Sequence, residues 1–537
     1  MNTLAVLYGG NLSAPAFEPL FSPPQGRGTA PVNALRLALE HAAAFPGVRN
    51  ILVLVSEGFE AARIPRSIAA GDIPITLSAS PGWTKKQLLD VLASHAGGYD
   101  LIYYAWADCP LLDPDLAAAL VDRHTRFAAE YTYADGWPYG FAPELLAPSA
   151  PGLLGRIIGG DDGPVGRDAL FSVLQKDINA FDIEAEIAPA DLRSHRLTLA
   201  ADSKRNLLLL TRLTAAGLRR AQDAERIIGE RPELLRTLPS FFAIQAAVPC
   251  PQRCAYCPYP AFASGAPEFL DTARFEALLD QIAAFSADGV IDLSLWGELA
   301  LHPQKLDLIR MVLARKELAL IIESSGLGWK PEELETLAAV AAERGRALSG
   351  PLLAPPLSWI VSLDTADPGE YQALRGAGFA EAQETAGLLL RLFPGDTYVQ
   401  AVRMKDREDD IERFYRHWKA SGASIIIQKY DDFCGFLPKK QAADLAPVQR
   451  RPCWHLMRDM NILINGDVPL CREYTAALGY AGSPGDGNLA EGRILGNVFQ
   501  ESLETIWSRG AGPYQEHCSQ VYAGICADCD EYYTFNF

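Results

Sequence analysis

Short apolar runs alternate with amphipathic stretches along the first 230 residues. The runs have the length of buried strands and lie at residues 4–8, 50–55, 73–78 and 100–105. Between them, residues 32–44 and 85–95 repeat apolar positions at helical spacing. This alternation predicts an α/β domain over residues 1–230, built as a βαβ series around a mostly parallel sheet.

The same alternation continues over residues 235–440. Six strand-like runs occur, at residues 241–247, 290–296, 319–325, 359–364, 398–403 and 424–430. Helical stretches such as 272–285 and 331–344 separate them. Six βα units predict a partial barrel, a (β/α)6 arrangement whose chemistry lies at the carboxyl ends of its strands.

The last part of the chain has a different pattern. In residues 460–471 an Asn-Gly pair separates two apolar runs, which predicts a hairpin. A helix-like stretch follows at residues 501–507. We therefore predict a third, small domain over residues 441–537.

Composition restricts the classes of function. The 537 residues are 49% hydrophobic and 21% charged, and the net charge of −18 disfavours binding to a nucleic-acid backbone. No apolar run reaches the ~18 residues of a membrane span. The ten cysteines cluster in C-x3-C-x2-C and C-x2-C spacings, which is typical of a metalloprotein in a reducing compartment. We expect a cytoplasmic protein.

Three cysteines follow the first strand of the expected barrel. Cys250, Cys254 and Cys257 have C-x3-C-x2-C spacing, and cysteine thiolates are the ligands of iron–sulfur clusters. Three thiolates on a four-iron cluster leave one iron open to a small molecule. The alternatives are a zinc site or scattered buried thiols, but structural zinc normally takes four ligands, and no fourth cysteine or close histidine follows Cys257.

At these residues the chain resembles the radical SAM superfamily, whose signature is C-x3-C-x-aromatic-C, with Tyr256 at the aromatic position. The resemblance implies that Cys250, Cys254 and Cys257 hold a catalytic 4Fe-4S cluster. It also implies reductive cleavage of S-adenosylmethionine to a 5′-deoxyadenosyl radical, which abstracts hydrogen from a C–H bond. An electron donor such as flavodoxin or ferredoxin is expected as a partner.

The same resemblance extends to the ends of later strands. The turn Trp296-Gly297-Glu298 corresponds to the family's G-G-E-P turn, with Trp296 and Leu299 in place of the first Gly and the Pro. The family's T-N-G and S-x-D positions fall on the segments 323–326 and 362–364. The cofactor-binding residues implied in this way are Tyr256, Gly297, Glu298, Ser324, Ser362 and Asp364.

Some residues at these strand ends have a second interpretation. Asp364 could instead cap the following helix. Arg403, at the end of the fifth strand, could meet a substrate carboxylate or form an ion pair at the barrel mouth.

A second cysteine set lies in the last hundred residues. Cys453 and Cys471 flank the expected hairpin, and Cys526 and Cys529 form a C-x2-C hook. They resemble the SPASM/twitch extension of radical SAM enzymes, including its C-x(9–15)-G-x4-C element. The resemblance implies one auxiliary 4Fe-4S cluster on these four residues, with a zinc ribbon as the rival. Two other cysteines are buried thiols or substitute ligands, Cys434 and Cys518.

The amino-terminal segment carries one specific motif, Asp108-Cys109-Pro110-Leu111 at the end of an expected strand. It resembles the D-x-P-L stretch of the molybdopterin-guanine and sugar-acid cytidylyltransferases, and thus a nucleotidyltransferase-like fold. Asp108 is either a metal ligand or a turn or cap residue. The first glycine loop, at residues 9–11, lacks the family's cations, and Arg27 is the nearby one. A degenerate binding or scaffolding domain is therefore expected.

The three-part order resembles the proteins called spiro-SPASM. That resemblance implies a radical SAM oxidoreductase that modifies a peptide or protein. Two alternatives remain: radical modification of a nucleotide-linked small molecule or sugar, and a non-catalytic iron–sulfur redox or scaffold protein.

Overall fold

The computed structural model describes residues 1–537 apart from 22–31, 69–71, 260–265, 346–354, 476–493 and 535–537. The described residues form two compact units. The first covers the described residues of Met1–Leu234, and the second covers the described residues from Leu235 onward. Each unit has its own sheet and core, and the two are described separately.

The first unit is built on an eight-stranded mixed sheet. Its strands, in spatial order, are β10 (Ile183–Ile187), β8 (Tyr131–Asp135), β9 (Glu144–Leu146), β7 (Leu101–Trp106), β1 (Thr3–Gly9), β4 (Val48–Ser56), β6 (Ile73–Ser80) and β5 (Ser67–Ile68). The four strands that the apolar runs predict, β1, β4, β6 and β7, pair in parallel at its centre. The antiparallel strands β9 and β5 are additions to the predicted series. The strands β2 (Pro19–Phe21) and β3 (Val32–Asn33) pair antiparallel and form a separate two-stranded ribbon.

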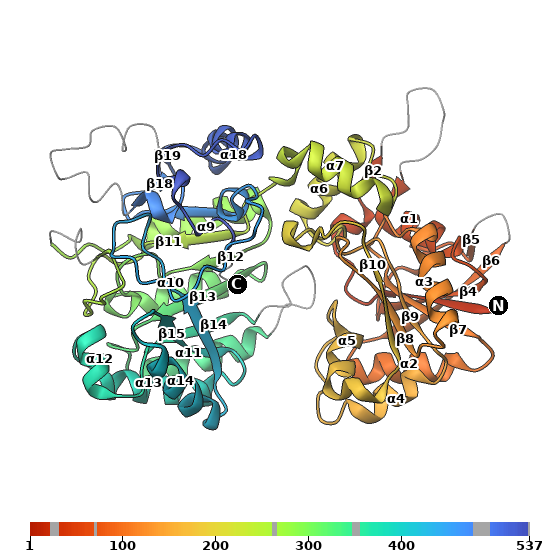
Figure 1. The fold of residues 1–537 in the computed structure, drawn as a ribbon, viewed down its shortest axis with the longest axis horizontal. Coiled ribbons are helices and arrows are strands. Elements are labelled where there is room, and N and C mark those ends of the chain that lie inside the picture. Colours follow the sequence, from red (N-terminus) through yellow and green to blue (C-terminus); the bar gives the residue numbers. More distant parts are fainter. Residues whose placement is uncertain (22–31, 69–71, 260–265, 346–354, 476–493, 535–537) are drawn as a thin grey trace. The chain divides into compact units, whose positions relative to one another are not determined.

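Helices flank this sheet on both sides (Figure 1). They start where capping residues satisfy free backbone N–H groups: Asn33 accepts from Arg36 N, and Thr84 with Gln87 forms a capping box. The α-helices are α1 (Ala34–Ala43), α2 (Lys85–Ala96), α3 (Pro114–Arg126), α4 (Ala150–Ile157), α5 (Ala169–Leu174), α6 (Lys204–Ala215) and α7 (Ala224–Glu230).

The second unit is built on a seven-stranded sheet whose strands are all parallel. Its order is β16 (Ser424–Lys429), β15 (Thr397–Arg403), β14 (Leu357–Ser362), β13 (Leu318–Ser324), β12 (Gly289–Asp292), β11 (Phe241–Ile244) and β17 (Asp459–Ile462). The first six strands in sequence each overlap one of the six predicted runs, although β11 and β12 end three and four residues before their runs do. The seventh, β17, comes from the last part of the chain and pairs with β11.

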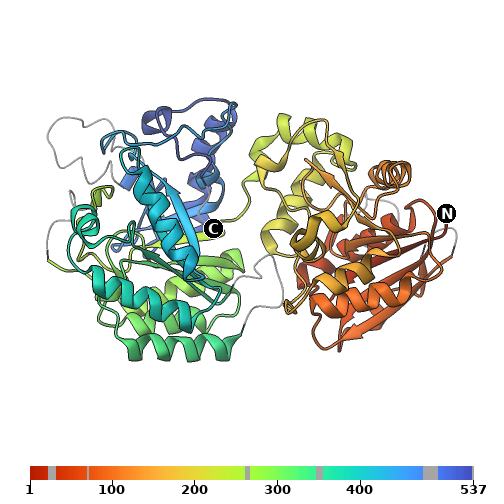
Figure 2. The same cartoon turned by 60° about the horizontal axis from the view of Figure 1, so that its bottom comes forward.

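Alternation along these strands separates two faces of the sheet. Residues such as Phe242, Ile322 and Trp359 pack under the helices, whereas their neighbours Phe241, Ile321 and Ile360 form a separate apolar cluster on the other face. The covering helices are visible along one side of the sheet in Figures 1 and 2. They are α9 (Thr272–Ser286), α10 (Lys305–Leu313), α11 (Pro331–Arg344), α12 (Pro368–Leu374), α13 (Phe379–Leu392) and α14 (Glu408–Ala420). The uncovered face is the interior of the partial barrel.

The segment after the barrel contains α15 (Trp454–Arg458), β18 (Asp467–Pro469), β19 (Ile494–Asn497), α17 (Leu503–Arg509) and α18 (Ala511–Cys518). The hairpin expected over residues 460–471 is wrong in its pairing. The chain does turn at Gly466, whose N–H donates to Leu463 O at 2.8 Å, but β17 pairs with β11 and β18 pairs with β19. The free edge of β11 offered β17 a parallel partner that sequence spacing does not reveal.

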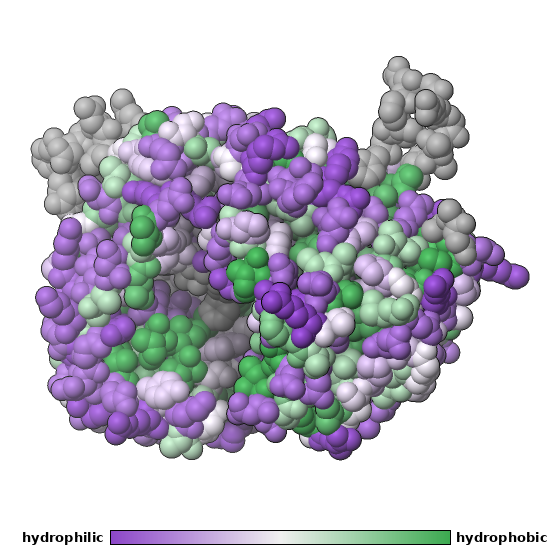
Figure 3. All heavy atoms as spheres, turned by 45° about the vertical axis from the view of Figure 1, so that its right-hand side comes forward, coloured by the Kyte–Doolittle hydropathy of each residue, from purple (hydrophilic) through white to green (hydrophobic). Residues whose placement is uncertain are grey.

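The mixed α/β composition with parallel sheets confirms the expected fold class. The expected domain boundaries at residues 230–235 and 440 stay predictions. On the face drawn in Figure 3, hydrophilic side chains surround smaller hydrophobic patches. Within the described ranges, no helix has the length and apolar character needed to cross a membrane.

Candidate active site

The loop from Cys250 to Cys257 follows β11 at the carboxyl end of the parallel sheet, where a barrel places its chemistry. The loop closes on itself through the Cys257 N–H, which donates to Cys254 O at 3.1 Å. The three thiols lie near enough to interact electrostatically, since Cys254 acts on both Cys250 and Cys257. The structure therefore brings together the three cysteines that the spacing singled out.

The surroundings of these sulfurs fit an iron–sulfur cluster. Backbone N–H groups of Gln252 and Tyr259 donate to the sulfurs of Cys250 and Cys257. Such N–H···S bonds stabilise ligating thiolates. Burial raises the pKa of the Cys257 thiol to about 12, so its ionisation requires a nearby cation such as iron. As ligands of a four-iron cluster, these three cysteines would leave one iron position open to a small molecule.

The cysteine loop is fastened to the carboxyl end of α12. The Arg253 N–H donates to Arg375 O at 3.0 Å, and the Ala255 N–H donates to Leu374 O at 2.8 Å. The side chain of Gln252 also donates to Ala377 O, at 2.8 Å. These three bonds hold the loop from one side along its length.

A buried ion pair lies beneath the loop. Arg375 donates to Asp364 Oδ2 at 2.7 Å, and the Tyr256 hydroxyl donates to the same oxygen at 2.6 Å. Asp364 Oδ1 accepts from the Val402 N–H at 2.9 Å. The side chains of Arg375 and Asp364 are only 5% and 2% exposed, so the pair is strongly shielded from water. The positive charge of Arg375 acts on all three cysteine thiols and favours their ionised form.

The turn Trp296-Gly297-Glu298 packs directly against the same loop. The Glu298 N–H donates at 2.9 Å to Pro249 O, one residue before the first cysteine. Gly297 has φ of +84°, and a Cβ at this position would overlap the backbone oxygen of Ala247. Glycine is therefore required here by both conformation and space. The turn presents its main chain beside the cysteines.

The Glu298 side chain is buried and fully engaged. Its Oε1 accepts from the Ser324 hydroxyl at 2.9 Å and from the Ala300 N–H at 3.2 Å. Its Oε2 accepts from the Ser325 N–H at 2.8 Å and from the Ser325 hydroxyl at 2.7 Å. The hydrogen bond between Glu298 and Ser324 thus connects the turn after β12 to the end of β13 and fixes the conformation of that turn.

Four polar side chains project from consecutive strands on the interior face of the barrel: Asp292, Glu323, Ser362 and Gln400. Glu323 Oε1 accepts from Ser362 Oγ at 3.0 Å and from Gln400 Nε2 at 2.7 Å. Burial, with the nearby Glu323 charge, raises the pKa of Asp292 to about 7. These four side chains form a polar row on the interior face of the barrel, where a bound substrate would contact them.

A second group of cysteines gathers in the carboxyl-terminal segment. The charges of Cys453, Cys526 and Cys529 all act on the partly buried Cys471. Cys453 precedes α15, and its sulfur accepts from the backbone N–H groups of His455 and Leu456. The structure therefore brings together the four residues that the C-x(9–15)-G-x4-C element and the hook singled out.

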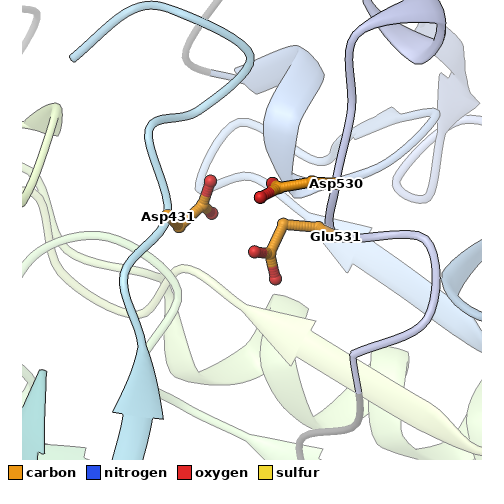
Figure 4. Close-up of side chains that lie close together, drawn as sticks. All are labelled: Asp431, Asp530 and Glu531. Carbon is orange, nitrogen blue, oxygen red and sulfur yellow. The ribbon is translucent and has the colours of Figure 1, made fainter. Parts of the chain in front are cut away.

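Three carboxylates also lie close together beside the hook. Asp431, Asp530 and Glu531 have ligand atoms within 4.8 Å of one another and point toward one another in Figure 4.

Asp108 in the first unit lies in a different environment. Arg167 donates to its Oδ1 at 2.9 Å and to its Oδ2 at 2.7 Å, and it also donates to Asp202 Oδ2 at 2.9 Å. The Arg167 guanidinium stacks 4.2 Å from the Trp106 ring centroid. Arg167 thus supplies the positive charge between two buried carboxylates. The metal role of Asp108 stays a prediction.

The first glycine loop also has a packing explanation. A side chain on Gly10 would collide with the rings of Trp83 and Tyr8, so glycine is needed there for the aromatic packing. Arg27, the nearby cation in the sequence, lies outside the described residues.

Sequence reasoning missed the residues that act through distant partners. Arg375, Gln400 and Asp292 carry no motif, although strand alternation places Gln400 and Asp292 on the interior face. Arg403 pairs with Glu408 at 2.8 Å, which confirms the ion-pair interpretation.

Comparison with known proteins adds two findings on sequence. Residues 453–530 match the model of SPASM, an iron-sulfur cluster-binding domain. A protein of Treponema pallidum (strain Nichols), described as an uncharacterized protein, is 36% identical over 377 residues, which are 68% of this chain and 98% of that protein.

Among solved structures, Streptococcus suis SuiB bound to precursor peptide SuiA is similar over 64% of this chain and 79% of its own, with 16% identity and a TM-score of 0.38. BtrN in complex with AdoMet and 2-DOIA is similar over 55% and 92%, with 14% identity and a TM-score of 0.33. A cytidylyltransferase from Leptospira borgpetersenii is similar over 43% and 95%, with 17% identity and a TM-score of 0.33.

The SPASM match falls on the second cysteine group, and the C-x3-C-x2-C loop stands at the mouth of a parallel partial barrel. The chain belongs to the same family as the Treponema pallidum protein, and behind its cysteine loop of radical SAM spacing it has a carboxyl-terminal SPASM domain, an iron-sulfur cluster-binding domain.

Proposed function

We propose that this chain cleaves S-adenosylmethionine reductively and uses the resulting radical to modify a peptide or protein at an unactivated C–H bond. The observation that carries the proposal is the contact between the Glu298 N–H and Pro249 O. It places the turn expected to bind S-adenosylmethionine directly beside the three cysteines expected to hold the cluster. When bound, the cluster and S-adenosylmethionine together supply the radical that abstracts hydrogen.

The residues of the chain have separate tasks in this proposal. Cys250, Cys254 and Cys257 hold the iron, and the main chain around Gly297 receives the amino group of S-adenosylmethionine. Tyr256, Asp364, Glu298, Ser324 and Ser362 act by fixing these loops, since their polar atoms bond one another and their neighbours. Positions fixed in advance lower the entropic cost of bringing the reacting groups together.

The carboxyl-terminal cysteines hold an auxiliary cluster in this proposal, through Cys453, Cys471, Cys526 and Cys529. Four thiolates leave no open iron, which suits electron transfer better than substrate chelation. An electron donor such as flavodoxin or ferredoxin supplies the reducing electron.

A peptide or protein is proposed as the substrate because the chain resembles the SPASM enzymes, which often modify peptides, and residues 453–530 match the SPASM model. The polar row on the barrel interior supports the proposal. Glu323 has an exposed carboxylate that can accept hydrogen bonds from backbone amides or an amino group.

An anaerobic assay of 5′-deoxyadenosine tests the substrate class. The reconstituted chain is incubated with S-adenosylmethionine and a reductant, with peptide fractions in one arm and nucleotide sugars in the other. The proposal expects faster 5′-deoxyadenosine formation, and a mass change in a peptide, only in the peptide arm. Stimulation by nucleotide sugars alone would favour the alternative of a nucleotide-linked substrate.

A further inference from the structure

Four carboxylates from three separate segments of the second unit lie beside the cysteine hook. Asp431 comes from the segment after β16, Glu473 from the segment after β18, and Asp530 and Glu531 directly follow the hook. Ligand oxygens of Asp431, Asp530 and Glu531 lie within 4.8 Å of one another, and Figure 4 shows these three side chains pointing toward one another. The four residues together are called the carboxylate cluster.

Glu473 belongs to the cluster because it shares an arginine with Asp431. Arg472 donates from Nη2 to Asp431 Oδ2 at 2.8 Å and from Nε to Glu473 Oε1 at 3.3 Å. These two nitrogens lie on one edge of the guanidinium fork, so the two carboxylates that they contact lie side by side.

The second carboxylate oxygen of Glu473 lacks a partner among the described residues. Glu473 is 6% exposed, and its Oε2 is buried and accepts no hydrogen bond from any residue that the structure describes. Burial removes the hydration of a charged oxygen, and the cost is large unless another group replaces the lost water. This oxygen therefore points to a ligand that the described chain does not supply.

The cluster also carries an excess of negative charge. Among the described residues two cations pair with it, Lys429 with the two acids after the hook and Arg472 with the other two. Four carboxylates and two cations leave two negative charges uncompensated. Three of the four acids are less than a tenth exposed, so water compensates little of this charge. A divalent cation would balance it.

The carboxylates keep oxygens that can contact an added ion. Lys429 and Arg472 each contact one oxygen of each of their two partners. Of the remaining oxygens, Asp431 Oδ1 accepts from the Phe433 N–H at 2.7 Å and Glu531 Oε2 accepts from the Thr534 hydroxyl at 2.8 Å. Each carboxylate oxygen has two lone pairs, so these contacts leave capacity for a cation. The Asp530 side chain is 35% exposed and gives an ion a path from solvent.

The dimensions of the cluster suit calcium. Ca²⁺ binds about six to eight oxygens at about 2.3–2.6 Å in a flexible geometry, so oxygens on opposite sides of the ion lie about 4.6–5.2 Å apart. Three oxygens within 4.8 Å of one another can therefore contact one ion. Mg²⁺ requires a nearly ideal octahedron at about 2.0–2.1 Å and retains its water, so an irregular set of carboxylates suits it less.

We propose that the carboxylate cluster binds one Ca²⁺ ion, which joins the segment after β16 to the segment after β18 and to the residues that follow the hook. The ion balances the two excess charges and contacts the buried Oε2 of Glu473. This inference goes beyond the proposed function, because none of the four carboxylates is a proposed ligand of iron or of S-adenosylmethionine.

Calcium binding is measured on the full-length chain after anaerobic reconstitution and removal of calcium with EGTA. The probes are CaCl2 and MgCl2, and binding is followed by equilibrium dialysis. Two variants each remove one carboxylate, Asp431→Asn and Glu473→Gln. The matched control is Asp406→Asn, whose carboxylate forms an exposed ion pair with Lys440 at 3.1 Å. Amide exchange is measured on peptides covering residues 526–534, with and without CaCl2.

We expect the wild type to bind one Ca²⁺ per chain with a Kd of roughly 10⁻⁵ to 10⁻³ M, because the two nearby cations lower the affinity of the site. Mg²⁺ should bind more weakly by roughly tenfold or more. Both cluster variants should weaken calcium binding by roughly tenfold or more, and Asp406→Asn should leave it unchanged. Calcium should slow amide exchange in residues 526–534 of the wild type, and it should not change exchange in β1.

Three results would count against the inference. Absence of saturable binding by the wild type up to about 10 mM CaCl2 would overturn it, and so would equal calcium affinity in the wild type and both cluster variants. Equal or tighter binding of Mg²⁺ would overturn the assignment to calcium. A chain that binds calcium but forms no 5′-deoxyadenosine would refute the proposed function alone, so the two claims fail separately.

Discussion

Replacing Arg375 by methionine should loosen the cysteine loop while leaving the rest of the chain intact. The change removes the positive partner of Asp364, whose carboxylate is 2% exposed and 2.7 Å from the guanidinium. Removing one partner of a buried pair costs about 3–5 kcal/mol because the other charge is left without compensation. The Arg375 backbone still holds the Arg253 N–H, so the loss acts through the side chain.

This cost should appear as faster amide exchange in the loop. The amides of Arg253, Ala255 and Cys257 are hydrogen-bonded, and they exchange when the loop opens. At 1.4 kcal/mol for each factor of ten, a loss of about 3–5 kcal/mol accelerates exchange by roughly 100-fold to 4,000-fold. Anaerobic hydrogen-exchange mass spectrometry can measure this on peptides covering residues 250–259, with peptides of β1 as the internal control.

A double-mutant cycle makes the experiment specific to the ion pair. The variant Asp364→Asn alone, and the double variant of both residues, are measured in the same way. Because the double variant has no uncompensated buried charge, its effect should be smaller than the sum of the two single effects. Exchange that changes by less than threefold in Arg375→Met, or strictly additive effects in the cycle, would refute this account of the loop.

Three further results are expected. Gly297→Ala should lower S-adenosylmethionine affinity at least tenfold in equilibrium dialysis, because the new Cβ meets Ala247 O; wild-type affinity would contradict the role of this turn. The folded-state pKa of Asp292 is raised to about 7, so the free-energy cost of ionising this carboxyl in the folded state grows from about pH 4 to pH 7. Asp292→Asn should therefore stabilise the protein to thermal unfolding more at pH 8 than at pH 5. An equal gain at both pH values would argue against burial of this carboxyl. Arg167→Met should lower the free energy of unfolding of the first unit by about 3–5 kcal/mol in urea, because it leaves Asp108 and Asp202 without their positive partner. Mn²⁺ should restore part of this loss by binding the two carboxylates. An unchanged free energy of unfolding would show that the Arg167 ion pairs do not stabilise this unit.

The parts of the fold that local patterns determine could be predicted from the sequence. Apolar runs bounded by turn residues predicted the six barrel strands, and the spacing of Cys250, Cys254 and Cys257 predicted the cysteine loop of the candidate active site. Pairing between distant segments could not be predicted in this way. The sequence of β17 predicts one half of a hairpin, whereas the three-dimensional structure shows that β17 pairs in parallel with β11.

The same limit applies to the site. Asp364 stands in a motif, but its partner Arg375 directly follows the next helix, α12, at a position with no signature. The likeness of Asp108 to a metal ligand is a local property, whereas its pairing with Arg167 depends on a contact across 59 residues of sequence. Single-sequence reasoning identifies residue types that suit a chemistry, and it does not show which charges the fold has already compensated.

The central claim is that Cys250, Cys254 and Cys257 hold the cluster at which S-adenosylmethionine is cleaved. Its most direct test is anaerobic measurement of 5′-deoxyadenosine and methionine after incubation of the reconstituted chain with S-adenosylmethionine and dithionite. The account predicts both products in equal amounts from the wild type and from Cys518→Ala, and neither from Cys254→Ala. Equal 5′-deoxyadenosine formation by Cys254→Ala and the wild type would contradict it.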